Sequence, residues 1–437
     1  MSLLDDSSPF ENLKSKIGRV KRTFLRYIEG MGSKKITVTF SDIQEAKQVL
    51  KKYLPVSPLL YNSWLSETFD CELYLKMENM QPIGSFKIRG ATYKISKLTA
   101  SERKRGVIAA SAGNHAQGVA WGSRKLGVDA LIVMPKAAPL MKIQNTRLLG
   151  AEVLLEGDNY EESFAVALKI AKKTGRVYVH AFEDRDVIAG QGTVGLEILE
   201  QLPDADMIIG SIGGGGLMAG VAIAVQEISP KISLIGAQAS GAASMVQSFK
   251  KGCPVHLDKV DTFADGIAVS EARAALFDLL LPRLSKVLEA DDESIAAAIL
   301  TLLEKGKTVS EAAGAVPLAV LDQLKKKIRG KKVVLIISGG NIDVNVLSRV
   351  IDRGLIRKGR RLRVNVLLSD RPGSLARLTA LIAQQGANVL QAIHDRSEPS
   401  TTIDRTEVAL TLETRGPEHS MEVIAALRDH VLSLSIL

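Results

Sequence analysis

Cysteine, aromatic residues and long hydrophobic runs are scarce in this sequence. The 437 residues include only two cysteines, Cys71 and Cys253, which allow one disulfide at most and cannot supply a cysteine-based zinc site. Aromatic residues make up 4%, which suits parallel sheets covered by helices better than an aromatic-rich β-sandwich. No apolar run reaches the roughly 18 residues of a membrane-spanning helix, so we expect none. A reducing cytoplasm is the simplest location for such a chain.

The net charge of +9 raises the question of nucleic-acid binding. The densest basic runs, at 325–327, 331–332 and 357–363, are not interleaved with aromatic residues that could stack on bases, so we expect no nucleic-acid partner. Residues 1–36 lack the basic-then-apolar order of a secretory signal, and we expect a poorly ordered extension there. Because this extension contains a basic, weakly amphipathic stretch, a transit segment is an alternative interpretation. The segment that begins at Met31 resembles the start of a protein, which favours the interpretation of the preceding residues as a surplus leader.

Length and periodicity together predict a multidomain α/β protein. The chain exceeds the roughly 250–300 residues that one hydrophobic core serves. From Thr37 onward, short apolar runs alternate with Ala-rich stretches of helical period, which is typical of βα units and parallel sheets. The first helix, DIQEAKQVLKKYL, has Ser41 available as its N-cap and ends before Pro55. The predicted strands lie at 107–111, 130–135, 151–156, 177–181, 207–212, 233–239 and 333–338.

The last part of the chain has a different pattern. The string RLRVNVLL alternates strictly between apolar and polar residues, and a helix with one apolar stripe follows, with Pro372 at its start. Two further strands, a second helix from Pro417 and a final strand complete the order βαββαβ of a ferredoxin-like fold. We therefore expect a separate small domain at 361–437, joined by a charged linker at 346–360.

A glycine-rich loop after a predicted buried strand is the first candidate for a binding site. It comprises Gly213, Gly214, Gly215, Gly216 and Leu217. Consecutive backbone N–H groups at a helix N-terminus favour an anion, and a phosphate group is the expected ligand. The spacing also satisfies the G-x-G-x-x-A pattern of dinucleotide sites, but Gln238 stands where an acidic residue should hold a ribose, which disfavours NAD. The alternative interpretation is that this loop is only a tight strand-to-helix turn and binds no ligand.

Three further strings accompany this loop: GSFKIRGA at 84–91, SAGNHAQG at 111–118 and SGGN at 338–341. In this order and spacing, the four strings resemble those of the threonine/serine dehydratase family of fold-type II pyridoxal-phosphate enzymes. The resemblance covers about residues 40–345, and the C-terminal segment with DRPGSL resembles an ACT domain. It implies pyridoxal 5'-phosphate as cofactor. It also implies a two-domain catalytic region at 37–345, in which a small subdomain at about 84–183 is inserted in a larger one.

The resemblance assigns the central role to Lys87, which would form the Schiff base with the cofactor. A lysine does so only as the free amine, so its pKa must be lowered by burial or by cationic neighbours. The apolar Phe86 and Ile88 and the nearby Arg89 make this plausible. Phe86 would lie against the cofactor ring, and Ser85 would lie close to the lysine amine and the phosphate. Ser338 would face the pyridine nitrogen, where a hydroxyl leaves that nitrogen unprotonated and favours loss of a β-leaving group over transamination.

In the SAGNHAQG string, Ser111, Gly113, Asn114 and His115 would, by the resemblance, hold the carboxylate of the substrate. Asn114 would also lie near the 3-oxygen of the cofactor. By the residues alone, Ser111 could be a helix cap and His115 an ordinary structural histidine. Ala112 stands where serine racemases of this fold carry a serine. Because a methyl group cannot move a proton, dehydration is favoured over racemisation.

Further positions bear on metal binding, on the cofactor and on the distinction from other relatives. Where racemase-like relatives carry carboxylates, this chain has Gln238, Ala242 and Ser244, so we expect no divalent metal there, while a monovalent ion held by carbonyl groups stays open. Glu311, in SEAAGA, resembles an acid near the cofactor, and the alternative is an exposed helical glutamate. The isoleucine after Lys87, in place of an aspartate, speaks against threonine synthase and cysteine synthase relatives.

The activity implied by the resemblance is the dehydration and deamination of L-threonine to 2-oxobutanoate and ammonia, with L-serine, giving pyruvate, as a second substrate. Lys87 would be both the anchor of the cofactor and the general base. The alternatives are a serine racemase or hydroxyaspartate dehydratase of the same fold, a non-catalytic amino-acid sensor, and an NAD-binding oxidoreductase. The intact Lys87 argues against a sensor, and Gln238 argues against the oxidoreductase.

The ACT resemblance implies a homo-oligomer, a dimer or tetramer, whose activity responds to an amino acid. ACT domains commonly pair edge to edge across subunits and bind an amino acid at that seam, near the first strand-to-helix turn. Isoleucine or valine are the leading expectations for this amino acid, with threonine or serine behind them. An ACT domain that serves dimerisation alone is the alternative. The matching positions are Asp370, Gly373, Ser374 and Leu375 on the turn and Asn388 on the next strand.

Overall fold

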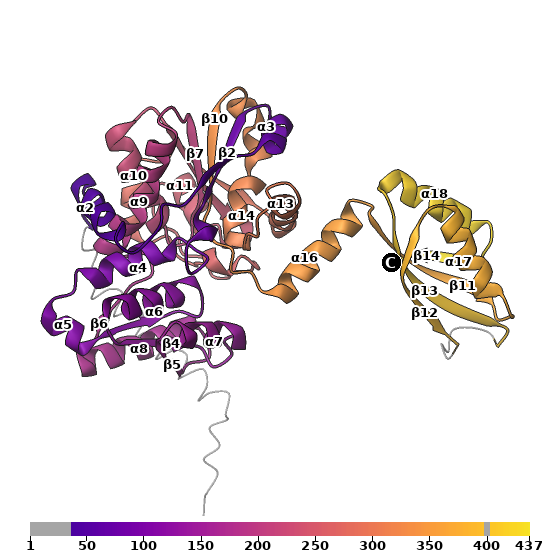
Figure 1. Ribbon diagram of the computed structural model, residues 1–437, viewed down its shortest axis with the longest axis horizontal. Helices are drawn as coiled ribbons and strands as arrows, with labels where there is room; N and C mark the ends of the chain where they lie inside the picture. The colour runs from indigo at the N-terminus through magenta and orange to yellow at the C-terminus, as the bar shows by residue number, and fades with distance from the viewer. Residues whose placement is uncertain (1–35, 397–402) are drawn as a thin grey trace, which may run out of the picture. The chain divides into compact units, whose positions relative to one another are not determined.

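The computed structural model describes residues 36–396 and 403–437, and these form two compact units (Figure 1). The first unit ends at Ile342, and the second comprises Asp343–Leu437. Apart from Ile36, the extension predicted at 1–36 lies outside the described residues. Among the helices of the described ranges, none has the length and apolar character needed to span a membrane.

A six-stranded sheet forms the centre of the first unit. Its strands, in spatial order, are β1 (Leu59–Tyr61), β2 (Glu72–Met77), β10 (Lys332–Ile337), β7 (Met207–Ser211), β8 (Ser233–Ala239) and β9 (Lys286–Ala290). Neighbouring strands are parallel except for β1, which pairs antiparallel with β2. Every residue of the central strand β7 is buried, as expected of a parallel strand covered on both faces.

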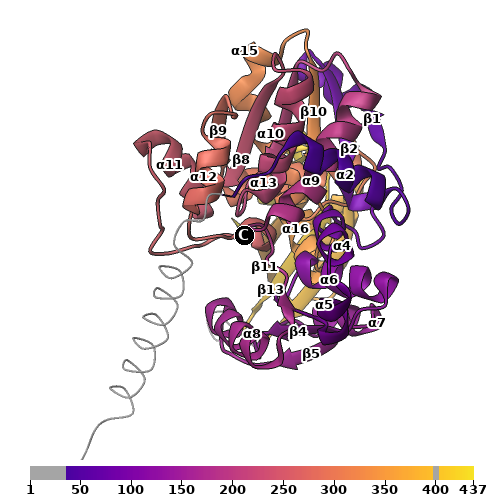
Figure 2. The ribbon, with the colours of Figure 1, turned by 90° about the vertical axis from the view of Figure 1, so that its left-hand side faces the viewer.

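A smaller sheet of four parallel strands belongs to the same unit. Its strands, in spatial order, are β5 (Glu152–Leu155), β4 (Ala130–Met134), β3 (Val107–Ala110) and β6 (Val177–Tyr178). Figure 2 shows the two sheets one above the other, with β8, β9 and β10 of the larger sheet in the upper part and β4 and β5 in the lower part. The predicted α/β class is confirmed, and the predicted parallel strands are found within a few residues of their expected bounds.

Helices cover the faces of these sheets. Those of the first unit are α2 (Phe40–Leu50), α3 (Ser63–Phe69), α4 (Lys87–Ser96), α5 (Ala100–Arg105), α6 (Asn114–Leu126), α7 (Leu140–Leu148), α8 (Tyr160–Thr174), α9 (Arg185–Gln201), α10 (Gly216–Ile228), α11 (Ser244–Lys251), α12 (Ala274–Leu280), α13 (Asp292–Glu304), α14 (Ala312–Ala319) and α15 (Lys325–Ile328). In Figure 1, α9 and α10 lie on one side of β7 and β10, and α13 and α14 lie on the other. Met218 and Val221 of α10 pack with Ile208 and Val334 of the two strands in one buried core.

Some local expectations differ from the structure. Ser41 does not cap the first helix, because Thr39 does: the hydroxyl of Thr39 accepts a hydrogen bond from the Asp42 N–H, and the Asp42 carboxylate accepts one from the Thr39 N–H. Strand β6 has two residues instead of the five predicted at 177–181. Strand β9 was not predicted, since its sequence KVLEA is short and carries a charged residue near each end.

The second unit contains a four-stranded antiparallel sheet of spatial order β12-β13-β11-β14. Its elements are α16 (Val344–Arg357), β11 (Arg361–Ser369), α17 (Ser374–Gln384), β12 (Asn388–Asp395), β13 (Arg405–Glu413), α18 (Pro417–Arg428) and β14 (Ser433–Ile436). The alternating residues of β11 are buried against α17 and α18, which confirms the predicted βαββαβ order. Helix α16 occupies most of the segment 346–360, for which the sequence predicted a linker.

Candidate active site

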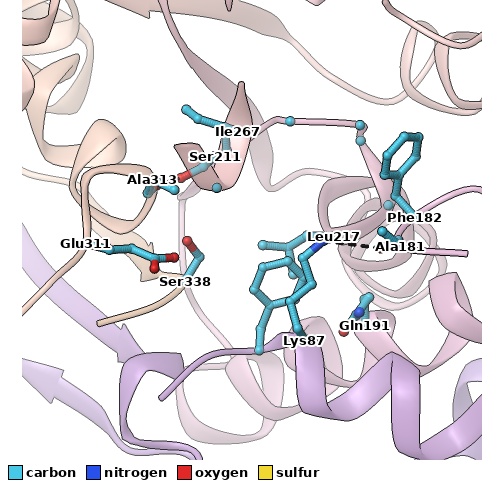
Figure 3. Close-up of a pocket in the computed structure, with 16 residues that line it drawn as sticks. Lys87, Ala181, Phe182, Gln191, Ser211, Leu217, Ile267, Glu311, Ala313 and Ser338 are labelled. Atoms are coloured by element: carbon cyan, nitrogen blue, oxygen red, sulfur yellow. Dashed lines mark hydrogen bonds between the residues drawn. The ribbon is translucent and has the colours of Figure 1, made fainter. Parts of the chain in front are cut away.

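One pocket of the first unit brings together residues from three of the four strings (Figure 3). Phe86 and Lys87 line it from the first string, Ser338 lines it from the last, and the whole glycine loop 213–217 forms part of its wall. Glu311 lies on the side of Ser338. The pocket has an empty volume of about 470 Å³, which includes space open to solvent.

Lys87 is the first residue of α4, and its side chain extends toward the carbonyl group of Ala181 (Figure 3). Its Nζ donates a hydrogen bond to that carbonyl oxygen at 3.2 Å and lies 5.3 Å from the centroid of the Phe86 ring. Burial lowers the pKa of Lys87 to about 8, although the nearby Glu311 acts in the opposite direction. At pH 8, about half of this lysine is therefore the free amine that covalent chemistry requires.

Arg89 does not lower the pKa of Lys87, contrary to the expectation from the sequence. Its buried guanidinium donates paired hydrogen bonds to Glu78 at 2.7 and 2.8 Å and to Glu197 at 2.7 and 2.8 Å. Lys76 donates to the same Glu197 at 2.7 Å, so two cations and two carboxylates compensate one another. The cluster ties α4 to α9, and the low pKa of the lysine comes from burial instead.

The glycine loop connects β7 to α10. Gly215 has a φ of 94° and directly precedes the first helical residue, Gly216. The backbone N–H groups of 213–215 donate no hydrogen bond to any residue of the described ranges, and unpaired donors at a helix N-terminus fit a phosphate group. A Cβ atom at Gly214 would overlap the ring of Phe182, and one at Gly216 would lie 2.9 Å from the Phe182 carbonyl oxygen. The loop therefore needs glycine, and it fits the phosphate of the cofactor that the resemblance implies.

Ser338 and Ser85 lie where the last string meets the first. Ser338 directly follows β10 and lines the pocket, and its carbonyl oxygen accepts a hydrogen bond from the Phe86 N–H at 3.0 Å. Ser85 forms an isolated antiparallel bridge with Gly339. The Ser85 hydroxyl is buried and has no hydrogen-bond partner among the described residues. Since buried hydroxyl groups normally form hydrogen bonds, this one is available to bond a polar atom of a ligand.

The SAGNHAQG string forms the turn from β3 to α6, and the helix begins at Asn114. The hydroxyl of Ser111 accepts a hydrogen bond from the Gly113 N–H at 3.1 Å, which closes the turn. The Nε2 of His115 lies 2.8 Å from the Val179 carbonyl oxygen, and burial lowers the pKa of this imidazole to about 3. The His115 side chain is thus neutral and already bonded. The part of His115 that can hold a substrate carboxylate is its backbone N–H, which lies in the first turn of α6.

Asn114 joins the second string to Glu311 and to Asn341 of the last string. The Nδ2 of Asn114 donates to both carboxylate oxygens of Glu311, at 2.8 and 3.0 Å, and its Oδ1 accepts from Asn341 at 2.8 Å. Glu311 is buried at the N-cap of α14, which excludes the exposed helical glutamate of the alternative interpretation. Burial raises the pKa of Glu311 to about 7, so its carboxyl group can hold or release a proton near neutral pH.

The segment after β6 also reaches the pocket, although none of its residues was predicted from the sequence to belong to the site. The Nδ1 of His180 accepts hydrogen bonds from the Phe182 N–H at 3.3 Å and from the Glu183 N–H at 2.8 Å. The one available signal was its place at the carboxyl end of a predicted parallel strand, where such sheets bind ligands. The pocket residues that were not predicted as site residues are Ala181, Phe182, Gln191, Ser211, Gly266, Ile267 and Ala313.

Gln238, found where a dinucleotide site needs an acid, has a structural role. Its Oε1 accepts hydrogen bonds from the Met245 and Val246 N–H groups at 2.9 and 3.0 Å, and its Nε2 donates to the Ile212 carbonyl oxygen at 3.2 Å. It thereby caps the first turn of α11. Within the described ranges, no group of three or more His, Cys, Asp or Glu side chains could hold a metal ion.

The predicted effector residues of the second unit lie at two ends of its sheet. Asp370 and Gly373 lie in the turn between β11 and α17, and Ser374 and Leu375 are the first two residues of the helix, which begins two residues after Pro372. Asn388, by contrast, pairs with Glu413, which pairs with Arg361 at the first residue of β11. Within one chain, Asn388 is therefore separated from the turn by the length of β11.

Comparison with known proteins finds a family for each of the two units. The family model described as "Pyridoxal-phosphate dependent enzyme" matches residues 51–339, and that of the ACT domain matches 362–429. The L-threonine ammonia-lyase of Thermotoga maritima is 47% identical over 88% of this chain and 96% of its own length. The solved threonine deaminase isoform 2 of Solanum lycopersicum has a TM-score of 0.69 and 38% identity, over 71% of this chain and 91% of that one.

A solved serine racemase from maize is also similar, with a TM-score of 0.69 and 32% identity over 73% of this chain and 98% of its own. The identity to the threonine ammonia-lyase is higher and extends over more of this chain. Together with the lysine, the glycine loop and the C-terminal sheet, these matches are decisive. This chain belongs to the threonine dehydratase (threonine ammonia-lyase) family of pyridoxal-phosphate enzymes with a C-terminal ACT domain.

Proposed function

We propose that this chain is an L-threonine ammonia-lyase, which converts L-threonine to 2-oxobutanoate and ammonia and accepts L-serine as a second substrate. The observation that carries the proposal is one pocket in which Lys87, with a pKa of about 8, lies together with the glycine loop and Ser338. The names of the relatives in Thermotoga maritima and Solanum lycopersicum support threonine as the substrate.

Lys87 has two roles in this proposal. When bound, pyridoxal phosphate supplies a carbonyl carbon that reacts with amines and a ring that withdraws electrons from the substrate Cα. Lys87 would attach the cofactor, while the free N–H groups of 213–215 would bind its phosphate. With the substrate amine bound at the cofactor, Nζ of Lys87 would be the general base for the Cα proton. The hydrogen bond from Nζ to Ala181 uses an N–H, which leaves the nitrogen lone pair for that proton.

The remaining residues orient the substrate and select the reaction. The backbone N–H groups at the start of α6, from Asn114 and His115, would hold the substrate carboxylate. Ser338 offers the pyridine nitrogen a hydroxyl instead of a carboxylate, which favours loss of the β-hydroxyl over transamination. Ala112 offers no proton to the opposite face of Cα, which favours elimination over racemisation.

The test is the loss of ammonia release from L-threonine in Lys87→Ala. We expect a loss of several orders of magnitude, because the substitution removes both anchor and base, and the absorption band of the bound cofactor should disappear with it. Lys104→Ala, which changes an exposed lysine of α5, is the matched control and should retain activity. Ammonia release by Lys87→Ala at the rate of the unaltered protein would end the assignment.

Regulation and assembly form a second part of the proposal. We expect a cytoplasmic homo-oligomer, a dimer or tetramer, whose activity responds to an amino acid at the turn 370–375, with isoleucine and valine as leading effectors. Kinetics and calorimetry of the full chain with each of the twenty amino acids test this, and Asp370→Ala should weaken the response. If no amino acid binds outside the pocket or shifts the rate, the ACT domain serves dimerisation alone. Sedimentation velocity tests the oligomeric state.

A further inference from the structure

The segment 179–183, directly after β6, contacts three of the strings that carry the chemistry. The Val179 carbonyl oxygen lies 2.8 Å from Nε2 of His115, and the Ala181 carbonyl oxygen accepts the hydrogen bond of Lys87 at 3.2 Å. Phe182 packs so closely on the glycine loop that no Cβ fits at Gly214. Figure 3 shows Ala181 and Phe182 together on the side of the pocket to which Lys87 extends. A shift of this segment would thus move several parts of the site at once.

His180 holds the backbone of this segment in place. Its Nδ1 accepts two hydrogen bonds, from the Phe182 N–H at 3.3 Å and from the Glu183 N–H at 2.8 Å. The imidazole also packs edge-on against the Phe182 ring, with 4.7 Å between centroids. Nδ1 can accept only while it is unprotonated. Burial, with the positive charges of Arg273 and Lys87, lowers the pKa of His180 to about 3, and this low pKa keeps Nδ1 unprotonated.

We propose that His180 is a positioning residue for the reaction: by fixing the turn 180–183, it places the Ala181 carbonyl at Nζ of Lys87 and the Phe182 ring against the glycine loop. The inference rests on the proposed function, because it concerns the lysine and the phosphate loop of that same site. His180 itself does not contact substrate in this role. Its effect is transmitted through the backbone of Ala181 and Phe182.

Three substitutions separate the hydrogen bonds from the bulk of the ring. His180→Leu keeps an apolar side chain but removes the acceptor. His180→Asn restores an acceptor at the right place, since an Asn side-chain oxygen accepts from the N–H two residues on, as in an Asx-turn. His180→Gln carries the same amide one methylene further out, which misplaces the acceptor. His256→Leu, at an exposed histidine of the same unit, is the control.

The first measurement is the kinetics of L-threonine deamination. We expect His180→Leu and His180→Gln to lower kcat ten- to a hundredfold while KM changes less than threefold, because a misplaced lysine affects the chemical step more than binding. His180→Asn should stay within about threefold of the unaltered protein. Melting temperatures of all variants show whether any loss reflects unfolding instead.

The second measurement does not depend on turnover. The rate at which pyridoxal phosphate combines with the apoprotein, followed by absorbance against pH, reports the free amine of Lys87. In His180→Leu and His180→Gln the midpoint should move up toward the ordinary lysine pKa, because a loosened turn admits water to the amine. An unchanged midpoint and kcat in these two, or an equal loss in a folded His180→Asn, would overturn the proposal. If the unaltered protein fails to deaminate threonine, the proposed function falls while this measurement still tests His180.

Discussion

The lowered pKa of Lys87 predicts that this lysine destabilises the protein when no cofactor is bound. An ordinary lysine has a pKa of 10.5, and burial brings that of Lys87 to about 8. The difference of about 2.5 pKa units corresponds to roughly 3 kcal/mol, at 1.36 kcal/mol for each unit. Because the folded state binds the proton less tightly than the unfolded state, the cost is fully present below pH 8. It decreases as the pH rises from 8 to 10.5.

The substitution Lys87→Met tests this, because it keeps the length of the side chain and removes the charge. At pH 7, we expect apoprotein Lys87→Met to exceed the unaltered apoprotein in free energy of unfolding by about 1–3 kcal/mol, and the pH-dependent part of that difference to vanish near pH 10.5. Urea unfolding of both apoproteins at several pH values between 7 and 10.5 measures it. Lys104→Met, at an exposed position, should show no such trend.

Two results would refute the reasoning. A gain in stability that is constant with pH would come from the packing of the methionine and not from the removed charge. A loss of stability at pH 7 would mean that the ammonium group is well paired in the folded state. In either case, burial would no longer explain why Lys87 is available as a free amine.

Three further predictions concern the same pocket. Gly214→Ala should weaken binding of pyridoxal phosphate, by about five- to a hundredfold in Kd, because the added methyl group overlaps the Phe182 ring; an unchanged Kd in an absorbance titration would contradict this. Ala112→Ser should raise the ratio of D-serine to pyruvate formed from L-serine, measured by chiral chromatography, and an unchanged ratio would show that this position does not control racemisation. Glu311→Gln removes the charge that raises the pKa of Lys87, so the midpoint of cofactor association should move to lower pH, and a move to higher pH would be the contrary result.

The sequence predicted the strands that carry the chemistry because these are buried and continuous. Strand β7, before the glycine loop, is buried throughout, and so are β3 and most of β10, before the second and last strings. In a parallel sheet the loops that follow such strands lie at one edge, so the order of the strings alone located much of the pocket. Lys87 needed the resemblance as well, since apolar neighbours such as Phe86 and Ile88 do not by themselves distinguish a buried lysine from an exposed one.

Residues that act through tertiary contacts could not be predicted. Arg89 lies two positions from Lys87 in the sequence, yet its charge is compensated by Glu78 and Glu197. His180 and Phe182 gain their significance from Lys87 and Gly214, which lie far away in the sequence and come close only in the folded chain. Local periodicity carries no information about such pairs.

The effector residues depend on a second chain, because the sequence prediction placed them at a seam between subunits and one chain does not bring them together. In β11, Ser369 pairs with Arg405 near the turn 370–375, whereas Arg361 pairs with Glu413, the partner of Asn388. Nine residues of strand, at about 3.3 Å each, separate the two ends. A site that uses both the turn and Asn388 must therefore take them from two chains. On this reasoning the proposed effector binding and the proposed oligomer stand together, since a monomer could bind an amino acid at the turn only without Asn388.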